Sequence, residues 1–206
     1  MAMKLSNHTA VLQGHRRSWR DHSLLLQRAP AAMLWLLFAA SNVLGQQKPT
    51  EYQVKTVYLY NFARFVEWPR NPDTKNDTFA ICVLGQDPFG PSLDTTLAGE
   101  IIDRKRVAAR RISDAKDAAS CNVLFISSSE EPRLKTTLST LDRTPVLTVS
   151  DIPQFSQRGG MIQFVLEGNR VRFEVNLTAA QNAGLTLSSE LLKVATAVRG
   201  AAPRGD

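Results

Sequence analysis

The side chains that carry most protein catalysis are unevenly distributed along this 206-residue chain. All the histidines, His8, His15 and His22, lie before residue 46. Histidine is the usual general base and the commonest metal ligand, so serine–histidine and cysteine–histidine nucleophiles are excluded from residues 46–206. Only two cysteines are present, which is too few for a zinc site without histidine. Carboxylate and lysine chemistry are not excluded, but an enzyme that uses carboxylates is favoured only by scattered acidic residues and is the hypothesis that we rank last. We predict no catalytic residue, no metal site, no cofactor and no enzymatic activity.

Four polar residues lie where the expected strands end: Asp87, Ser127, Ser128 and Asp151. In open parallel sheets, ligands bind beyond the carboxyl ends of the strands, near the point where the strand order reverses. These residues are our candidate ligand pocket; the alternative is that they only serve the loops. The loop around Asp87 lacks the spacing of a nucleotide-binding loop, and Asp87 followed by Pro88 is also typical of a helix cap.

Residues 52–68, YQVKTVYLYNFARFVEW, contain all the tyrosines of the chain. At about 100° per residue, most of the apolar side chains share one broad helical face, with Leu59 at its margin. Asn61 falls within that face, where a buried amide needs hydrogen-bond partners. Tyr60 lies on the polar face with no core to join, and an exposed tyrosine beside Arg64 suits a protein contact. Tyr60 and Arg64 are our candidate partner-binding residues.

The segment RKRVAARR (104–111) concentrates positive charge. Such a segment could bind an acidic partner or anionic lipid headgroups. Basic side chains also protect an edge strand from pairing with other chains. We favour the edge role.

Strands and helices alternate between residues 50 and 151. A capping box of Thr50 and Gln53 begins a helix, and Pro69 ends it. Strands are predicted at 78–85, 106–112, 121–127 and 145–151, with helical links between them. This order predicts an α/β fold of three layers, with a mostly parallel, doubly wound sheet.

A C-terminal β-hairpin and flanking helices complete the predicted fold. The hairpin spans 161–176 and turns at Gly168-Asn169, where a glycine at the first turn position suits a type II′ turn. A two-residue turn places apolar residues opposite one another: Leu166 with Val171, Phe164 with Phe173, and Ile162 with Val175. A short helix ending at Gly184 and an amphipathic helix at 188–198 follow.

Residues 1–45 have the three parts of a secretory signal: a basic region, a short apolar run, and small residues up to a cleavage site at Gly45. The run is shorter than the roughly 20 residues that span a bilayer; the alternative is a buried N-terminal helix. Residues 46–200 then form a single domain, and 201–206 a disordered tail. Without the leader, 20 of 25 basic and 18 of 19 acidic residues remain, so we expect no nucleic-acid binding. We also expect no direct membrane insertion, because the polar face of the helix predicted at 52–68 is mixed in charge and not basic.

The two cysteines of an exported chain predict one disulfide. A bond between Cys82 and Cys121 would close a loop of about 39 residues and stabilise the fold by roughly 4 kcal/mol on chain-entropy grounds. The alternative is two buried thiols inside strands.

Several motifs together resemble the YfiR-like periplasmic family: EYQVKTVYLYNFARFVEWP, ICVLGQDPFG, CNVLFIS, and the segment from VLTVSD to ELLKVA. The resemblance covers nearly all of residues 51–198. It implies a secreted α/β protein that forms a homodimer and has no known catalysis. The best-described members repress a membrane-bound diguanylate cyclase by binding its periplasmic part, under redox or envelope stress control. Cys82 and Cys121 match one disulfide position of the family, and a second pair found in some members is absent.

The predicted leader, the absence of histidine from residues 46–206 and the family resemblance lead to one expectation about function. We expect a periplasmic regulator that binds the periplasmic part of an inner-membrane signalling protein, of the diguanylate cyclase type, and represses it. The alternative is a periplasmic small-ligand-binding module with no cyclase partner, which the residues at the strand ends motivate.

Overall fold

The computed structural model describes residues 49–69 and 77–200. The predicted signal peptide with its cleavage site and the predicted tail lie outside these residues. An eight-stranded sheet has the order β10-β8-β7-β6-β5-β2-β4-β3. Its strands are β2 (Thr78–Leu84), β3 (Ile101–Ile102), β4 (Lys105–Ile112), β5 (Val123–Ile126), β6 (Leu147–Ser150), β7 (Ile162–Glu167), β8 (Arg170–Asn176) and β10 (Ala197–Arg199).

Parallel pairing joins the central strands, from β4 through β2, β5 and β6 to β7. Strands β2 and β5 are apolar along their length and almost wholly buried, as strands covered on both faces must be. One core lies between the sheet and four helices: α3 (Glu51–Arg64), α4 (Pro91–Leu97), α6 (Leu177–Asn182) and α7 (Ser189–Val194). The predicted three-layer α/β fold with a mostly parallel sheet is confirmed.

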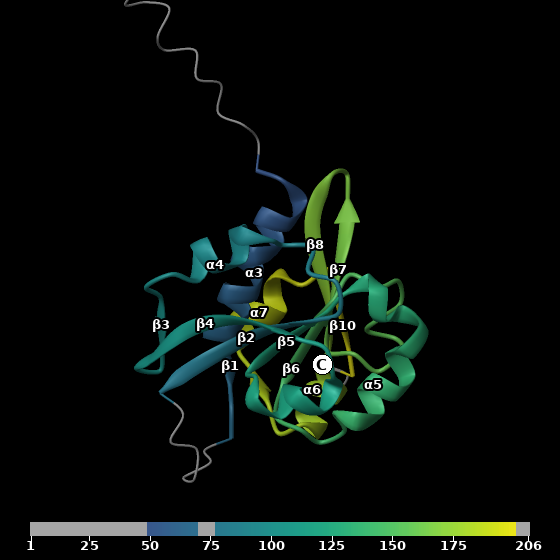
Figure 1. Cartoon of the computed structure of the whole chain (residues 1–206). Coiled ribbons are helices and arrows are strands. Elements are labelled where there is room, and N and C mark those ends of the chain that lie inside the picture. The colour runs from purple at the N-terminus through teal and green to yellow at the C-terminus, as the bar shows by residue number, and fades with distance from the viewer. Residues whose placement is uncertain (1–48, 70–76, 201–206) are drawn as a thin grey trace, which may run out of the picture. The chain divides into compact units, whose positions relative to one another are not determined.

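A second core on the opposite face is covered by another set of helical elements (Figure 1). They are the 3-10 helices η2 (Ala115–Ser120) and η3 (Ser128–Arg133) and the helix α5 (Leu134–Thr140). Segments β1 (Val66–Glu67) and β9 (Thr186–Leu187) form a separate two-stranded sheet, which the sequence pattern did not predict.

Helix α3 begins with the predicted capping box of Thr50 and Gln53, but it ends at Arg64 and not before Pro69. The chain leaves the helix early because Val66 and Glu67 pair with β9 and so exchange helical for strand hydrogen bonds. The buried face is also rotated from the predicted one. Leu59, expected at the margin, is fully buried, and Val57 is 49% exposed.

The β7–β8 hairpin has the predicted register, with Phe164 opposite Phe173 and Ile162 opposite Val175. The predicted turn type was wrong: Gly168 and Asn169 both have positive φ, at 52° and 61°, which is the pattern of a type I′ turn. The predicted helix at 188–198 is also only partly correct. Helix α7 ends at Val194, and β10 then pairs in parallel with β8 because both the amide and the hydroxyl of Thr196 bind the Phe173 carbonyl.

The basic segment 104–111 forms β4, which lies one position from the sheet edge. Among residues 49–69 and 77–200, β3 pairs with it only at Lys105 and Arg106, so most of β4 has one neighbouring strand in this part of the chain. The predicted edge position is therefore correct for the second half of β4 and wrong for its first residues.

Candidate protein-interaction surface and strand-end residues

The strand order reverses at the carboxyl ends of β2 and β5, because the chain visits β4 on one side of β2 before it returns to β5 on the other. In doubly wound sheets this is where a ligand crevice opens. Here the two loops pack against each other: the amide of Gln86 donates to Ser129 Oγ at 2.9 Å. A Cβ added to Gly85 would lie 2.5 Å from the same Ser129 oxygen. The reversal point is thus filled by the protein's own atoms.

Asp87, the first candidate pocket residue, is held by its own neighbours. One carboxylate oxygen accepts from the Phe89 amide at 2.8 Å, and the other accepts from Arg111 Nε at 2.9 Å. Asp87 is not the predicted helix cap, because α4 begins at Pro91 with Gly90 as its N-cap. Arg111 also donates to both carboxylate oxygens of Asp94, each at 2.7 Å, and these hydrogen bonds lower the pKa of Asp94.

Ser127 and Asp151 have hydrogen-bond partners different from those of Asp87. Ser127 is buried, and its amide donates to the Leu84 carbonyl, whereas Ser128 is exposed at the start of η3. No hydrogen bond links Asp87 with any of the other three candidate residues within 49–69 and 77–200. Four hollows on the described surface are all lined by other residues.

Asp151 belongs to a buried ionic cluster beneath α3. Its Oδ2 accepts from Lys55 Nζ at 2.7 Å and from the Tyr52 hydroxyl at 2.9 Å. Lys55 is only 2% exposed and also pairs with Glu51 at 2.5 Å. Burial, and then the charge of Asp151, raise the pKa of Tyr52 above its ordinary value. With its partners in place the cluster is a structural link between α3 and the end of β6.

Sequence reasoning missed Lys55, because a lysine on a helix is ordinarily exposed. The only local signal was the spacing of Glu51 and Lys55, which is four residues and allows an ion pair on one helix face. That spacing does not reveal the burial, which depends on Asp151 almost a hundred positions away.

An apolar groove of about 650 Å³ lies between α3 and α4. Its lining residues are Pro49, Gln53, Val54, Val57, Tyr58, Asn61, Pro91, Ser92, Thr95 and Thr96. Asn61 was predicted on the buried face of the helix, where its amide would need hydrogen-bond partners. It is instead half-buried at this groove and outside the core, so that need does not arise.

Tyr60 and Arg64, the candidate partner-binding residues, lie together at the C-terminal end of α3. The Tyr60 hydroxyl donates to Glu100, and this hydrogen bond raises the pKa of Tyr60. The Arg64 guanidinium lies 5.8 Å from the centre of the Tyr60 ring. Tyr60 was expected to have no core to join, but it is half-buried and packs against the core, and its hydroxyl is bound by Glu100.

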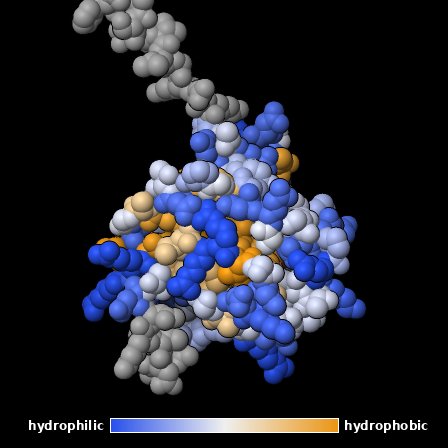
Figure 2. All heavy atoms as spheres, viewed as in Figure 1, coloured by the Kyte–Doolittle hydropathy of each residue, from blue (hydrophilic) through white to orange (hydrophobic). Residues whose placement is uncertain are grey.

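Beside these residues is a hollow of about 670 Å³, whose lining includes Arg64, Trp68 and Ile101. Ile101 is 63% exposed. We call Tyr60, Arg64, Glu100, Ile101 and this hollow the α3–β3 surface. Ile101 and Arg64 line the same hollow, and Tyr60 contacts both Arg64 and Glu100. An exposed apolar residue near an aromatic ring and charges of both signs is typical of a protein interface. The face seen in Figure 2 is largely hydrophilic, with small apolar areas between polar side chains.

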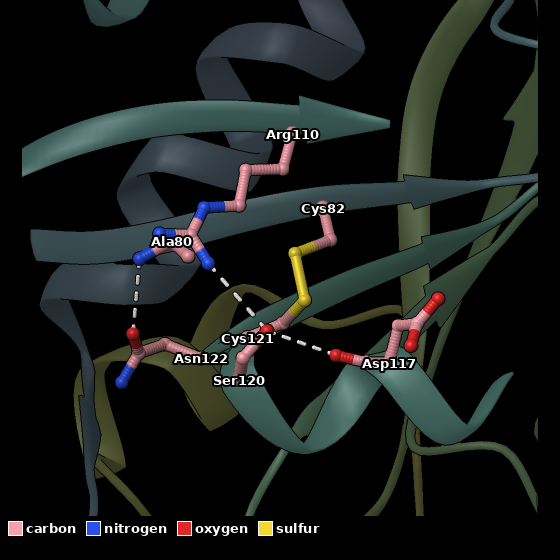
Figure 3. Close-up of a disulfide and its surroundings, with 7 residues drawn as sticks. All are labelled: Ala80, Cys82, Arg110, Asp117, Ser120, Cys121 and Asn122. Carbon is pink, nitrogen blue, oxygen red and sulfur yellow. Dashed lines mark hydrogen bonds between the residues drawn. A yellow bond between two sulfur atoms is a disulfide. The ribbon is translucent and has the colours of Figure 1, made fainter. Parts of the chain in front are cut away.

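The Cys82–Cys121 disulfide is formed and joins β2 to the residue that follows η2, with the two Cα atoms 6.0 Å apart (Figure 3). Both cysteines are buried. Next to the bond, the Ala80 amide donates to Asn122 Oδ1 at 3.0 Å, which fixes the start of β5 against β2. The predicted pairing is confirmed, and the alternative of two free thiols is wrong.

Among residues 49–69 and 77–200, none of the helices combines the length and the apolar composition of a membrane span. In the same residues, no cluster of three or more histidine, cysteine, aspartate or glutamate side chains is arranged to hold a metal ion.

Two solved structures resemble this chain at 12% sequence identity. One is a conserved domain protein from Vibrio cholerae O1 biovar eltor, with a TM-score of 0.49 over 73% of this chain and 60% of that chain. The other is the ABC domain in complex with L-Trp from Streptococcus pneumonia, with a TM-score of 0.40 over 58% of this chain and 55% of that chain. This chain therefore spans less than two thirds of either structure's length.

A comparison with protein families gives a match over residues 52–196, from the first turn of α3 to the residue before β10. The matched segment includes both cysteines, the α3–β3 surface, and Tyr52, Lys55 and Asp151 of the ionic cluster. On this match the chain belongs to the YfiR/HmsC-like family.

Proposed function

We propose that this protein is a non-enzymatic periplasmic regulator, which binds the periplasmic part of an inner-membrane signalling protein of the diguanylate cyclase type and represses it. The observation that carries the proposal is the family match over almost the whole described domain. The filled reversal point of the sheet supports a role without catalysis, because the crevice in which this fold class usually holds a substrate is closed by loop packing.

The α3–β3 surface is the proposed contact with the signalling protein. Ile101 supplies exposed apolar area, while Tyr60 is held in one orientation by Glu100. A tyrosine fixed in this way loses little conformational entropy on binding, and aromatic and arginine side chains are enriched at the energetic centres of interfaces. The adjacent hollow offers room for one partner side chain.

Affinity capture from envelope extracts tests this proposal. Immobilised wild-type protein should recover a membrane diguanylate cyclase, and Ile101→Asp should not. Leu166→Asp is the matched control, because Leu166 is similarly exposed but lies near the tip of the β7–β8 hairpin. Tyr60→Ala should weaken recovery, with thermal unfolding measured in parallel because Tyr60 also touches the core.

Deletion of the gene should raise cellular cyclic-di-GMP if the protein is a repressor. Complementation with wild type or Leu166→Asp should restore the level, and Ile101→Asp should not. The proposal fails if no membrane signalling protein is recovered and cyclic-di-GMP is unchanged on deletion. We also propose a homodimer, which light scattering of the purified mature chain would show as twice the mass measured by mass spectrometry.

The groove between α3 and α4 favours a second candidate, a small-ligand-binding module. Concave, mostly apolar sites with a few polar groups are typical of ligand pockets, and Asn61 and Thr95 supply such groups here. A thermal-shift screen of amino acids and nucleotides would detect a ligand. Its stabilising effect should disappear in Val57→Trp, which fills the groove, and persist in Val194→Trp, a similarly exposed position on α7. An effect that survives in Val57→Trp would reject the groove.

A further inference from the structure

Strand β4 bonds to β2 through alternate residues. The Arg106 amide donates to the Asp77 carbonyl at 3.2 Å, and at the other end the Ile112 carbonyl accepts from the Gly85 amide at 3.4 Å. Even-numbered residues of β4 therefore direct their main-chain groups toward β2, and odd-numbered residues direct theirs to the outer side.

The outer side of β4 is only partly covered. The Val107 amide donates to the Glu100 carbonyl at 2.9 Å, and β3 reaches no further along the strand. Beyond it, the main-chain groups of Ala109 and Arg111 have no hydrogen-bond partner among residues 49–69 and 77–200. An edge strand with open amides and carbonyls is a template for pairing with another extended segment.

The side chains along this edge are positively charged. Arg106, Arg110 and the nearby Lys116 are exposed and form no ion pair within the described part of the chain, whereas Arg111 is neutralised by Asp87 and Asp94. Figure 3 shows Arg110 on the face of the sheet that carries the disulfide, where it reaches Ser120 Oγ at 3.5 Å. An open hollow of about 690 Å³ adjoins it and is also lined by Lys116.

We propose that the β4 edge, meaning the open main chain of Ala109 and Arg111 with the charges of Arg106, Arg110 and Lys116, binds an extended acidic segment of a partner polypeptide as an additional strand. Main-chain hydrogen bonds would provide affinity, and side chains would provide specificity. Arg110 lies between the two open residues, and Arg106 lies on the same face roughly 13 Å along the strand, where β3 is already paired. Acidic residues of the added strand would therefore meet Arg110 directly and Arg106 only at the end of the strand that faces β3.

The charge argues against a second copy of this chain as the occupant. Pairing of two β4 edges would place basic side chains opposite basic side chains, which is unfavourable. The same charge thus rejects self-pairing and selects acidic strands. An anionic membrane would satisfy the charges but not the alternating amides and carbonyls. This inference goes beyond the proposed function, because it concerns a different surface and does not require the partner to be a cyclase.

Binding of a fluorescent eight-residue peptide of alternating glutamate and valine, measured by anisotropy, tests the inference. The peptide of alternating lysine and valine is its control. Ala109→Pro should abolish binding, because it removes an outward amide without touching the β2 ladder. Arg106→Gln/Arg110→Gln should weaken binding about tenfold, as loss of two charge-assisted contacts implies. Lys135→Gln, an exposed lysine on α5, should bind like wild type.

Hydrogen exchange supplies a second measurement: the peptide should slow exchange at the Arg111 amide in wild type. If Ala109→Pro proves unfolded, the hydrogen-exchange measurement still tests the proposal, because it uses the wild type and the Arg106→Gln/Arg110→Gln variant. No binding of the acidic peptide up to about 1 mM, a free energy near −4 kcal/mol, overturns the proposal. So does equal binding of the basic peptide.

Two further outcomes also contradict it. If phosphatidylglycerol vesicles compete for the site and Ala109→Pro binds the peptide like wild type, the patch is a charged surface and not a strand template. If the wild type self-associates and Ala109→Pro abolishes the association, the edge pairs with a second copy.

Discussion

At the scale of single residues, the hydrogen-bond partners of a side chain determine whether it is free to bind a ligand. Asp151 and Asp87 follow strands of the central sheet, yet each is already bound by cations and hydrogen-bond donors of the same chain. A carboxylate that is satisfied in this way must lose those partners before it can bind anything else. We therefore expect Asp87 and Asp151 to contribute to the stability of the fold and not to ligand binding.

The Lys55–Asp151 pair gives a direct test at this scale. Lys55→Met should destabilise the domain by about 3 to 5 kcal/mol, because it leaves a partly buried carboxylate without its cation. Lys55→Met/Asp151→Leu should recover most of that loss, since both charges are then absent. Urea unfolding measures each difference. The exposed pair of Lys193 and Glu190 is the control, and Lys193→Met should change stability by less than about 1 kcal/mol. Equal losses in both lysine variants would contradict the structural role of Lys55.

Tyr52 predicts how stability changes at alkaline pH. Its pKa is raised in the folded state from an unfolded value of 10.0, so the folded state binds the hydroxyl proton more tightly. The resulting stabilisation is complete below pH 10 and is lost as the pH rises above it. Tyr52→Phe should therefore show a shallower loss of stability above pH 10 than wild type in denaturant titrations. Tyr58→Phe is the matched aromatic control, and an unchanged slope in Tyr52→Phe would refute the assignment.

Residue-level predictions succeeded where the determining contacts are local or chemically unique. The capping box of Thr50 and Gln53 spans one helical turn, and the disulfide could pair only the two cysteines present. The burial of Lys55 and the packing of Tyr60 depend on Asp151 and Glu100, which are distant in the sequence. Helical periodicity contains no information about such partners.

At the scale of elements, the β7–β8 hairpin shows that the sequence pattern predicts the strand register but not the turn type. Its register follows from matching apolar residues, which a shift by one residue would destroy. Its turn type does not, because glycine is acceptable in both primed turns. The last strand, β10, was missed for a different reason: it pairs with β8, and this pairing depends on the hydrogen bonds from Thr196 to the distant Phe173 carbonyl.

Exchanging the two turn residues distinguishes the turn types. Gly168→Asn/Asn169→Gly should maintain or raise the free energy of unfolding, by up to about 1 kcal/mol, since Asn-Gly is the preferred type I′ sequence. A type II′ turn would be destabilised by the same exchange, because it requires glycine at the first position. Thermal unfolding of the variant against wild type gives the sign, and a clear loss of stability would contradict the type I′ geometry.

For the molecule as a whole, the disulfide is a covalent constraint that joins two distant segments of the chain. Intact-mass measurement after alkylation of the non-reduced protein should show no label. Cys82→Ala/Cys121→Ala should lower the free energy of unfolding by roughly 4 kcal/mol, because it removes a cross-link that closes a loop of about 39 residues. Urea unfolding of wild type with and without reductant should show a similar difference. Two alkyl labels on the non-reduced protein would refute the bond.

The position of that bond also has a consequence for the order in which the sheet assembles. Strands β2 and β5 are neighbours in space but are separated along the chain by all of β4 and its connections, so their pairing is a slow, non-local step. Once Cys82 and Cys121 are joined, this step becomes local, and the β7–β8 hairpin is local already. The oxidised chain then has two folding nuclei, the β2–β5 pair and the β7–β8 hairpin. Strand β6 lies between them in the sheet and joins them when it pairs with β5 and β7. Refolding from denaturant should therefore be faster for the oxidised chain than for the reduced one, so the bond would set the rate of assembly as well as its stability.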